Sequence, residues 1–398
     1  MKYIVVIADG MADEALPQLD HRTPLEAART PWMDRLAGLG MVGRIATQLP
    51  NELPESDRAN MNLLGFDTAQ YYAGRAGIEA AGMNIPIGRG DICYRMNLVT
   101  VSEDGKTLLD YAGGYPTDEE KDALVEALRP LLPEGMRLYR GVGYRQILTW
   151  QNGKEWSLPK PQEYVGEVLP EMAQPFYQLQ KAAREVLLKH PVNLKRAAKG
   201  LPMANGIWFW GGGHSCVLPS FSVQHGLRAG VIAGVNVMKG LARAAGMAVP
   251  QVPGATGDKH TDYTAKAEAA VDLVLGGYDA AVIHIEAPDE ASHQGSIEDK
   301  VLAIERIDEM VGQLVQQLTQ AEERFRLAVT ADHRSSVLQR KHIRGEVPFL
   351  VYDSGREVNG ERGFYETAPA VLKGPLYFGT EFLQTAVWKQ SEKGYEER

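Results

Sequence analysis

The stretch that decides the fold is His284-Ile-Glu-Ala-Pro-Asp289-Glu-Ala-Ser-His293-Gln-Gly295. It follows an apolar run, residues 279–285, that is typical of a buried strand. Asp289 and His293 lie four residues apart just beyond this strand, so their side chains can face one point. A carboxylate and a neutral imidazole are common ligands of Zn²⁺ or Mn²⁺. Two such residues in a loop are more often solvated surface, so a metal site requires matching ligands elsewhere.

Matching residues flank other apolar runs in the chain. They are Asp9 after residues 3–8, Asp332 and His333 after residues 325–330, and His342 before residues 347–351. In open α/β sheets, ligands bind outside the carboxyl ends of the strands. The sequence therefore predicts an α/β fold with a metal site at that edge of the sheet.

Length and composition limit the classes of protein to consider. A chain of 398 residues is longer than most chains that form a single hydrophobic core. This length favours either two domains or one large domain with a smaller domain inserted in it. The net charge of −9 and the pI near 5.6 argue against a nucleic-acid partner and a polybasic membrane surface. Cys93 and Cys216 are too few for a disulfide framework, and the chain begins with a strand in place of a signal peptide. We therefore expect a soluble, cytoplasmic protein without a membrane partner.

Residues 91–166 have a different pattern from the rest of the chain. Short strands are predicted over residues 94–101, 107–111, 136–139 and 144–150, with a helix over 117–132. Thr117, followed by Asp118 and Glu119, is a good start for this helix. None of the candidate metal ligands falls here. We therefore expect 91–166 to form an inserted α+β domain, and 1–90 with 167–398 to form the core domain.

Ser56 stands at the start of a predicted helix, within Leu53-Pro-Glu-Ser56-Asp57. A serine in this position is most often an N-cap that accepts a backbone hydrogen bond. The alternative is a nucleophile at a helix N-terminus, where the free N–H groups favour a bound phosphate. The residues alone favour the cap.

The order of the motifs resembles a known family. The chain carries Ala8-Asp9-Gly-Met, Thr23-Pro-Leu-Glu, Pro54-Glu-Ser56-Asp57, Gly74-Arg75-Ala-Gly-Ile-Glu, Ala204-Asn205-Gly-Ile-Trp-Phe-Trp210, Pro253-Gly-Ala-Thr-Gly257, the stretch from His284 to His293, Ala331-Asp332-His333 and His342. In this order they resemble the archaeal-type, cofactor-independent phosphoglycerate mutases of the alkaline phosphatase superfamily. The resemblance covers nearly the whole chain.

That resemblance implies a mostly parallel sheet flanked by helices, with the inserted domain closing over a small phosphorylated substrate. It implies exchange of 3-phosphoglycerate and 2-phosphoglycerate through a phosphoserine at Ser56. Two divalent ions are implied, Mn or Zn with Mg or Co as alternatives. By this resemblance one ion is held by Asp9, Ser56, Asp332 and His333, and the other by Asp289, His293 and His342. The oligomeric state stays open.

Further residues are candidates for the substrate side. Lys239 is a candidate for the cation that the family places beside the nucleophile. An arginine fork binds a phosphate or carboxylate at two points, which makes Arg75, Arg95 and Arg145 candidate clamps. For each arginine alone, a surface salt bridge is the simpler interpretation. Six other histidines have no such placement and are expected to be structural or exposed: His21, His190, His214, His225, His260 and His284.

The chain departs from the family on the substrate side. It has Lys160-Pro-Gln-Glu163, Ala112-Gly-Gly114 and Gly211-Gly-Gly213 where relatives usually carry other residues. These departures leave a homoserine kinase-like or other phosphotransfer open as an alternative. A metal-dependent binding protein without catalysis is a further alternative, which the complete set of ligands disfavours.

Overall fold

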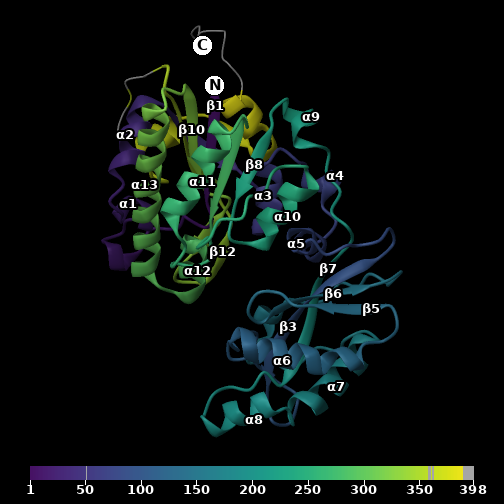
Figure 1. Ribbon diagram of the computed structural model, residues 1–398. Helices are drawn as coiled ribbons and strands as arrows, with labels where there is room; N and C mark the ends of the chain where they lie inside the picture. The colour runs from purple at the N-terminus through teal and green to yellow at the C-terminus, as the bar shows by residue number, and fades with distance from the viewer. Residues whose placement is uncertain (51, 357–359, 361–362, 389–398) are drawn as a thin grey trace. The chain divides into compact units, whose positions relative to one another are not determined.

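The computed structural model describes residues 1–50, 52–356, 360 and 363–388. Within them the chain forms two compact units. The first contains residues 1–72 together with the chain from Val217 onward, and the second contains Ala73–Cys216. Each unit is built on its own sheet (Figure 1).

The first unit is organised around a seven-stranded sheet. In spatial order its strands are β14 (Leu376–Phe378), β2 (Met41–Ala46), β13 (Val347–Asp353), β10 (Phe325–Thr330), β1 (Lys2–Ala8), β9 (Ala280–Ile285) and β8 (Ala229–Ile232). The central strands β1, β9 and β10 are apolar and almost wholly buried, as expected for strands covered on both faces. β13 runs antiparallel to both its neighbours, and the other pairings are parallel. The mostly parallel α/β sheet predicted from the sequence is confirmed.

The register of the central strands brings the candidate site residues to one edge. Ile7 of β1 pairs with His284 of β9 on one side and with Thr330 of β10 on the other. Because the three strands are parallel, the residues just beyond them leave the sheet at the same end. Asp9, Asp332 and the start of the helix after β9 therefore lie close together at this edge of the sheet.

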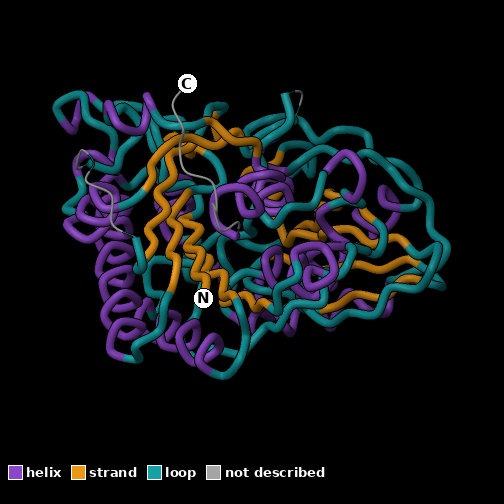
Figure 2. Tube along the Cα trace, turned by 90° about the horizontal axis from the view of Figure 1, so that it is seen from above, coloured by secondary structure: helices purple, strands orange, loops and turns teal. Residues whose placement is uncertain are grey.

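Helices cover both faces of this sheet (Figure 2). They are α1 (Pro24–Ala27), α2 (Pro31–Leu39), α3 (Ser56–Leu63), α4 (Thr68–Tyr71), α9 (Phe221–His225), α10 (Asn236–Ala244), α11 (Tyr263–Leu275), α12 (Ala287–Gln294), α13 (Ile297–Gln320), α14 (Pro369–Lys373) and α15 (Gly379–Phe382). Single 3₁₀ and π turns span Pro17–Leu19 and Leu383–Trp388, and a short hairpin pairs β11 (Arg334–Ser336) with β12 (Lys341–Ile343).

Side-chain caps fix several of these helices. Ser296 accepts a hydrogen bond from the Asp299 N–H at the start of α13, and Asp262 accepts one from the Ala265 N–H at the start of α11. The Asp308 carboxylate on α13 accepts the N–H groups of Trp32 and Met33 at 3.2 and 2.7 Å, and so caps α2 from another helix. The first two caps are local to their helices, whereas the Asp308 contacts join α13 to α2.

The second unit contains an antiparallel sheet with helices. Its strands are β4 (Leu108–Asp110), β3 (Ile92–Val101), β6 (Arg145–Trp150) and β5 (Met136–Tyr139), and β7 (Gly206–Gly213) pairs with β3 as well. Its helices are α5 (Arg75–Gly82), α6 (Asp118–Leu128), α7 (Phe176–Leu187) and α8 (Pro191–Ala198), with 3₁₀ turns at Arg129–Leu131 and Pro161–Tyr164. Thr117 and Glu120 form a reciprocal capping box on α6, where the sequence predicted a helix start.

The boundaries of this unit differ from the expected 91–166. Residues 73–90 and 167–216, which we assigned to the core domain, belong to the second unit. The reason is that α5, α7 and β7 pack against β3 and its neighbours: Phe176 of α7, for example, lies in the same hydrophobic cluster as Tyr94 and Phe209. Such long-range contacts leave no local mark in the sequence.

The glycines 211–213 form the last three residues of β7. A Cβ on Gly213 would come within 2.6 Å of the Ala73 carbonyl oxygen, and one on Gly212 within 2.7 Å of the Tyr94 ring. The glycines therefore permit close packing of the strand.

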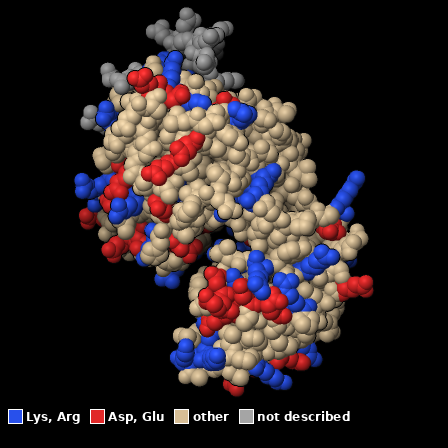
Figure 3. Space-filling view, in the orientation of Figure 1, with Lys and Arg blue, Asp and Glu red and all other residues tan. Residues whose placement is uncertain are grey.

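The surface charges are mixed. On the face seen in Figure 3, acidic and basic side chains are interspersed. Over α6, for example, Glu126 pairs with both Arg129 and Arg140. Among the described residues, no helix has the length and apolar character needed to cross a membrane.

Candidate metal centre

The first group of ligand atoms lies where β1 and β10 end. Asp9 follows β1 directly and Asp332 lies two residues after the end of β10, and both are fully buried together with His333. His333 Nε2 lies 3.2 Å from Asp9 Oδ1 and 3.6 Å from Asp332 Oδ2. The three residues could share one ion.

The second group is built on α12 and the hairpin strand β12. Asp289 and His293 lie one helical turn apart on α12, and His342 lies on β12. His293 Nε2 is 3.2 Å from Asp289 Oδ2, and His342 Nε2 is 3.4 Å from Asp289 Oδ1. The family resemblance implied that these three residues bind one ion, and the structure brings them together.

The distances in both groups suit atoms that share a metal ion. Two ligands with bonds of about 2.1 Å at an angle of about 100° are about 3.2 Å apart. The carboxylate oxygens of Asp9 are buried, yet neither takes part in a hydrogen bond. A buried carboxylate in that state is costly unless a cation compensates it.

The orientations of the two histidines in the second group fit metal binding as well. The Nδ1 atom of His342 lies 2.5 Å from the Pro54 carbonyl oxygen, and that of His293 lies 3.1 Å from the Arg340 carbonyl oxygen. A carbonyl can only accept, so each Nδ1 carries a proton, and when the ring is neutral Nε2 has its lone pair toward the group. The residues present therefore fit two divalent ions.

Ser56 is not a helix cap. The N-cap of α3 is Glu55, whose side chain makes no capping bond, and Ser56 is the first helical residue. The Ser56 hydroxyl oxygen instead lies 3.1 Å from His333 Nε2, and its residue is 7% exposed. The side chain therefore faces the first ligand group, and the cap interpretation is wrong.

The carboxylates of the two groups have shifted pKa values. Burial raises the pKa of Asp9 well above its usual range, and the charges of Asp332 and Glu286 add to this. Burial also acts to raise the pKa of Asp289, but His293 and His342 outweigh it and hold that pKa well below its usual range. In return Asp289 raises the pKa of His293 to about 9. Without metal, protons therefore compensate part of the clustered charge.

Some supporting residues gave no signal in the sequence. Ser335 is fully buried and donates a 2.5 Å hydrogen bond to Asp289 Oδ1, while its oxygen lies 3.2 Å from His333 Nδ1. Asn60, one turn after Ser56 on α3, donates a 2.7 Å bond to Asp332 Oδ2. Nothing in the sequence indicated Ser335. The role of Asn60 could have been suggested only by its position four residues after Ser56 on a predicted helix.

We expect Ser335 to orient ligands of both groups. Removing its hydroxyl in Ser335→Ala leaves His333 Nδ1 and Asp289 Oδ1 without that partner, and losses of this kind weaken metal binding by about 10- to 100-fold. Ser335→Thr keeps the hydroxyl and should bind nearly as well as wild type. Isothermal titration with Mn²⁺ would measure the affinities. Equal affinities in all three proteins would remove Ser335 from this role.

His284 was expected to be structural or exposed, and the structure corrects half of that expectation. It is 1% exposed, and its Nε2 lies 3.3 Å from Asp9 Oδ2. Burial lowers the pKa of His284 to about 4, so its ring is neutral. Side chains alternate between the two faces of a strand, but this pattern in the sequence could not show that His284, and not a neighbouring residue, faces Asp9.

The other predicted residues lie outside these two groups. Lys239 lies on α10, a helix that packs against α3. Arg75, Arg95 and Arg145 come together in the second unit around the Glu79 carboxylate. Glu79 pairs with Arg75 at 2.9 Å and with Arg95 at 3.2 Å, and the charge of Arg145 acts on it too. Arg95 is buried and stacks over the Trp210 ring at 4.1 Å.

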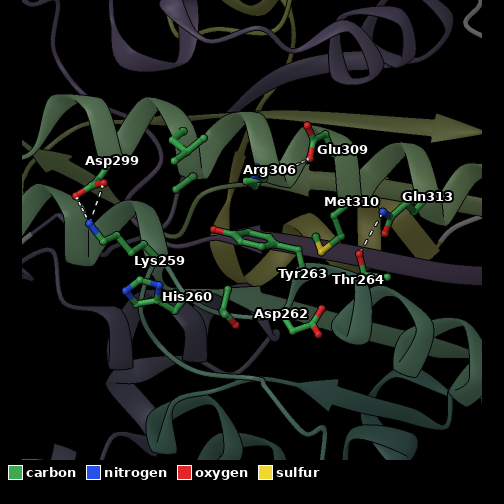
Figure 4. A pocket seen from close by; sticks show the side chains of 13 residues that line it. Lys259, His260, Asp262, Tyr263, Thr264, Asp299, Arg306, Glu309, Met310 and Gln313 are labelled. Carbon is green, nitrogen blue, oxygen red and sulfur yellow. Dashed lines mark hydrogen bonds and ion pairs between the residues drawn. The ribbon is translucent and has the colours of Figure 1, made fainter.

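A separate hollow of about 350 Å³ lies between α11, α13 and the loop before α11 (Figure 4). Four of its charged residues form two ion pairs, Lys259 with Asp299 at 3.0 Å and Arg306 with Glu309 at 2.8 Å. Because these charges are already compensated, the hollow offers no comparable ligand set, and the metal groups remain the candidate site.

Comparison with known proteins agrees with this geometry. A family model described as the Metalloenzyme superfamily matches residues 1–373. A protein of Methanothrix thermoacetophila named 2,3-bisphosphoglycerate-independent phosphoglycerate mutase is 39% identical over 373 residues, which are 92% of this chain and 94% of the relative. A protein of Geobacter sulfurreducens, named a probable enzyme of the same kind, is 36% identical and covers 94% of this chain and 96% of its own.

Solved structures show the same fold. A protein from Pyrococcus horikoshii superposes with a TM-score of 0.81 at 29% identity, covering 96% of this chain and 95% of the other. The cofactor-independent phosphoglycerate mutase from Thermoplasma acidophilum superposes with a TM-score of 0.60 at 26% identity, covering 96% and 98%. The chain belongs to the Metalloenzyme superfamily and, within it, to the family of the 2,3-bisphosphoglycerate-independent phosphoglycerate mutases.

Proposed function

We propose that this protein interconverts 3-phosphoglycerate and 2-phosphoglycerate through a phosphoserine at Ser56. The observation that carries the proposal is the position of the Ser56 hydroxyl, 3.1 Å from His333 Nε2 at the start of α3 and beside buried carboxylates. The relatives named above supply the substrate. We propose that the protein acts in the cytoplasm.

In this proposal Asp9, Ser56, Asp332 and His333 hold one divalent ion, and Asp289, His293 and His342 hold the other. The mixture of nitrogen and carboxylate donors favours Mn²⁺ or Zn²⁺ over Mg²⁺. When bound, the ions would lower the pKa of the serine hydroxyl and neutralise charge on the phosphoryl group.

The serine then acts as the nucleophile. Its oxygen gives up its proton and attacks the phosphorus of 3-phosphoglycerate, a Ser56–phosphate ester forms, and the bond from phosphorus to the C3 oxygen breaks as that oxygen takes up a proton. The C2 hydroxyl of the same glycerate then loses its proton and attacks the phosphorus of the phosphoserine. The bond from phosphorus to the Ser56 oxygen breaks, and that oxygen takes up a proton. Burial of Ser56 helps to exclude water, which would otherwise hydrolyse the ester.

The arginine cluster of the second unit is proposed to bind the anionic groups of the substrate. Support comes from its charge, since three guanidinium groups surround one carboxylate, Glu79. Arg95 is held in place by both the ion pair and the Trp210 ring, so its positive charge has a fixed position. We propose that the unit Ala73–Cys216 acts as the cap over the substrate, and that Lys239 supplies positive charge near Ser56.

Metal binding should release protons. Asp289 raises the pKa of His293 to about 9, so at pH 7.5 the metal-free ring carries a proton that a bound ion would displace. The apparent affinity should therefore rise as the pH rises toward 9 and fall about tenfold for each unit below it. Calorimetry of Mn²⁺ binding in buffers of different ionisation enthalpy measures the released protons. Heats that do not depend on the buffer would contradict this expectation.

The decisive assay uses purified protein loaded with Mn²⁺. With 3-phosphoglycerate and no added 2,3-bisphosphoglycerate, we expect 2-phosphoglycerate to form. A parallel reaction contains ATP and homoserine. Phosphohomoserine without 2-phosphoglycerate would replace the proposal by a kinase, and no product in either reaction would favour a metal-dependent binding protein.

A further inference from the structure

A buried ion pair that belongs to neither ligand group lies against the hairpin. The Lys300 ammonium donates to Asp13 Oδ2 at 2.8 Å, and both side chains are fully buried. The same ammonium donates to the backbone carbonyl oxygen of Ser335 at 2.6 Å. Asp13 Oδ2 also accepts the Val337 N–H at 3.1 Å, and the Ser335 N–H donates to the Ala12 carbonyl oxygen at 2.9 Å. One ion pair therefore binds the backbone on both sides of it.

The pair joins the three segments that carry the ligands. Asp13 lies in the loop after β1, four residues beyond Asp9. Lys300 lies in the first turn of α13, which packs against α12, the helix of the second ligand group. Ser335 lies on β11, two residues after His333. The loop, the helix pair and the hairpin thus meet at a single ammonium group.

Stability alone does not account for such a pair. Removing an ammonium and a carboxylate from water costs free energy that their attraction often fails to recover, and apolar side chains of similar volume often serve a core equally well. Asp13 is nevertheless held on every side. Its Oδ1 accepts the Glu14 N–H at 2.7 Å, and its own N–H donates to the buried Glu366 carboxylate at 2.8 Å. The contacts specify one arrangement of the backbone around the pair.

We propose that Lys300 and Asp13 are positioning residues of the metal centre, which hold the Ser335 backbone where its hydroxyl can orient a ligand of each group. The Ser335 hydroxyl donates to Asp289 Oδ1 at 2.5 Å, and its oxygen lies 3.2 Å from His333 Nδ1. A shift of this backbone would therefore disturb both ligand groups at once. The inference rests on the proposed two-ion centre.

The first variant is Lys300→Met, which keeps the length of the side chain and removes the ammonium. It should bind Mn²⁺ about 10- to 100-fold more weakly than wild type by isothermal titration, the range typical of lost contacts that orient ligands. Half-maximal turnover of 3-phosphoglycerate should shift to higher Mn²⁺ concentration by a similar factor. The melting temperature should fall too, because the buried Asp13 carboxylate loses its compensating charge.

The double variant, Lys300→Met with Asp13→Asn, separates positioning from stability. It leaves no uncompensated charge at the pair, so it should melt nearer to wild type than Lys300→Met does. Its Mn²⁺ affinity should stay about 10- to 100-fold below wild type, because the Ser335 carbonyl still lacks the ammonium. Wild-type affinity in the double variant would overturn the proposal, since the pair would then only stabilise the fold. A double variant that does not fold would overturn it for the same reason.

Lys121→Met is the matched control. Lys121 is a nearly buried lysine of the second unit, and it likewise donates to a carboxylate, Asp118, at 2.7 Å and to a carbonyl oxygen, that of Gly141, at 3.1 Å. This variant should melt at a lower temperature and keep the wild-type affinity for Mn²⁺. An equal loss of affinity in Lys121→Met would make the effect a general one and overturn the proposal.

The titration also separates this inference from the proposed function. Wild type that binds Mn²⁺ without interconverting the phosphoglycerates would contradict the proposed reaction, and the affinities of the variants would still decide the role of Lys300. Wild type that binds no Mn²⁺ would overturn both.

Discussion

Replacing Asp289 with alanine is expected to abolish turnover, with a loss of at least about a thousandfold, and to remove one bound ion. Asp289 is the only carboxylate of its group, and its two oxygens face His293 and His342 at 3.2 and 3.4 Å. Without it, two neutral imidazoles remain, and they do not offset the charge of a divalent ion. Steady-state kinetics and elemental analysis of the same preparation measure both losses.

Neighbouring variants separate the metal from the fold. His342→Ala should lose the same ion, because it removes another ligand of that group. Glu290→Ala removes the carboxylate next to Asp289 on α12, which accepts a hydrogen bond from Gln294. We expect Glu290→Ala to keep both ions and near wild-type turnover. If Asp289→Ala is folded by circular dichroism and still active, Asp289 does not hold a catalytic ion.

The central sheet could be predicted because its strands are short, apolar and followed by charged residues. Buried parallel strands leave this local pattern, and the position of a ligand pair such as Asp332 and His333 just after β10 follows from it. The helical spacing of Asp289 and His293 likewise depends on only one turn of α12. These features are local in the chain, so a single sequence contains them.

The features that could not be predicted depend on contacts between distant residues. The second unit begins at Ala73 because α5 packs on β3 and β7. Ser335 reaches both Asp289 and His333 only after the chain turns at the end of β10. His284 lies in a strand in which every residue is buried, so neither burial nor alternation distinguishes it. The resemblance to a family named the ligands, but it did not indicate these supporting contacts.

Ser56→Ala is the second variant with a very large expected effect. Turnover should fall on the order of a thousandfold or more, because alanine offers no oxygen to form the phosphoester. Stability should hardly change. A lost N-cap would cost about 1 kcal/mol. Ser56 makes no capping bond, however, and alanine is a good residue for the first turn of α3. Thermal melting and kinetics on one preparation test both halves of the expectation.

Further variants decide whether the hydroxyl itself reacts. Ser56→Asn has a polar side chain without a hydroxyl and should be as inactive as Ser56→Ala, whereas wild type quenched with substrate should show a phosphate on Ser56 by mass spectrometry. Ser336→Ala is the matched control, because the Ser336 hydroxyl lies on the hairpin but donates to Glu14, away from the ligand groups. It should keep both turnover and the phosphate on Ser56. An active Ser56→Asn protein would show that the phosphoryl group does not pass through this serine, and the mechanism would then need a direct transfer between the two hydroxyl groups of glycerate.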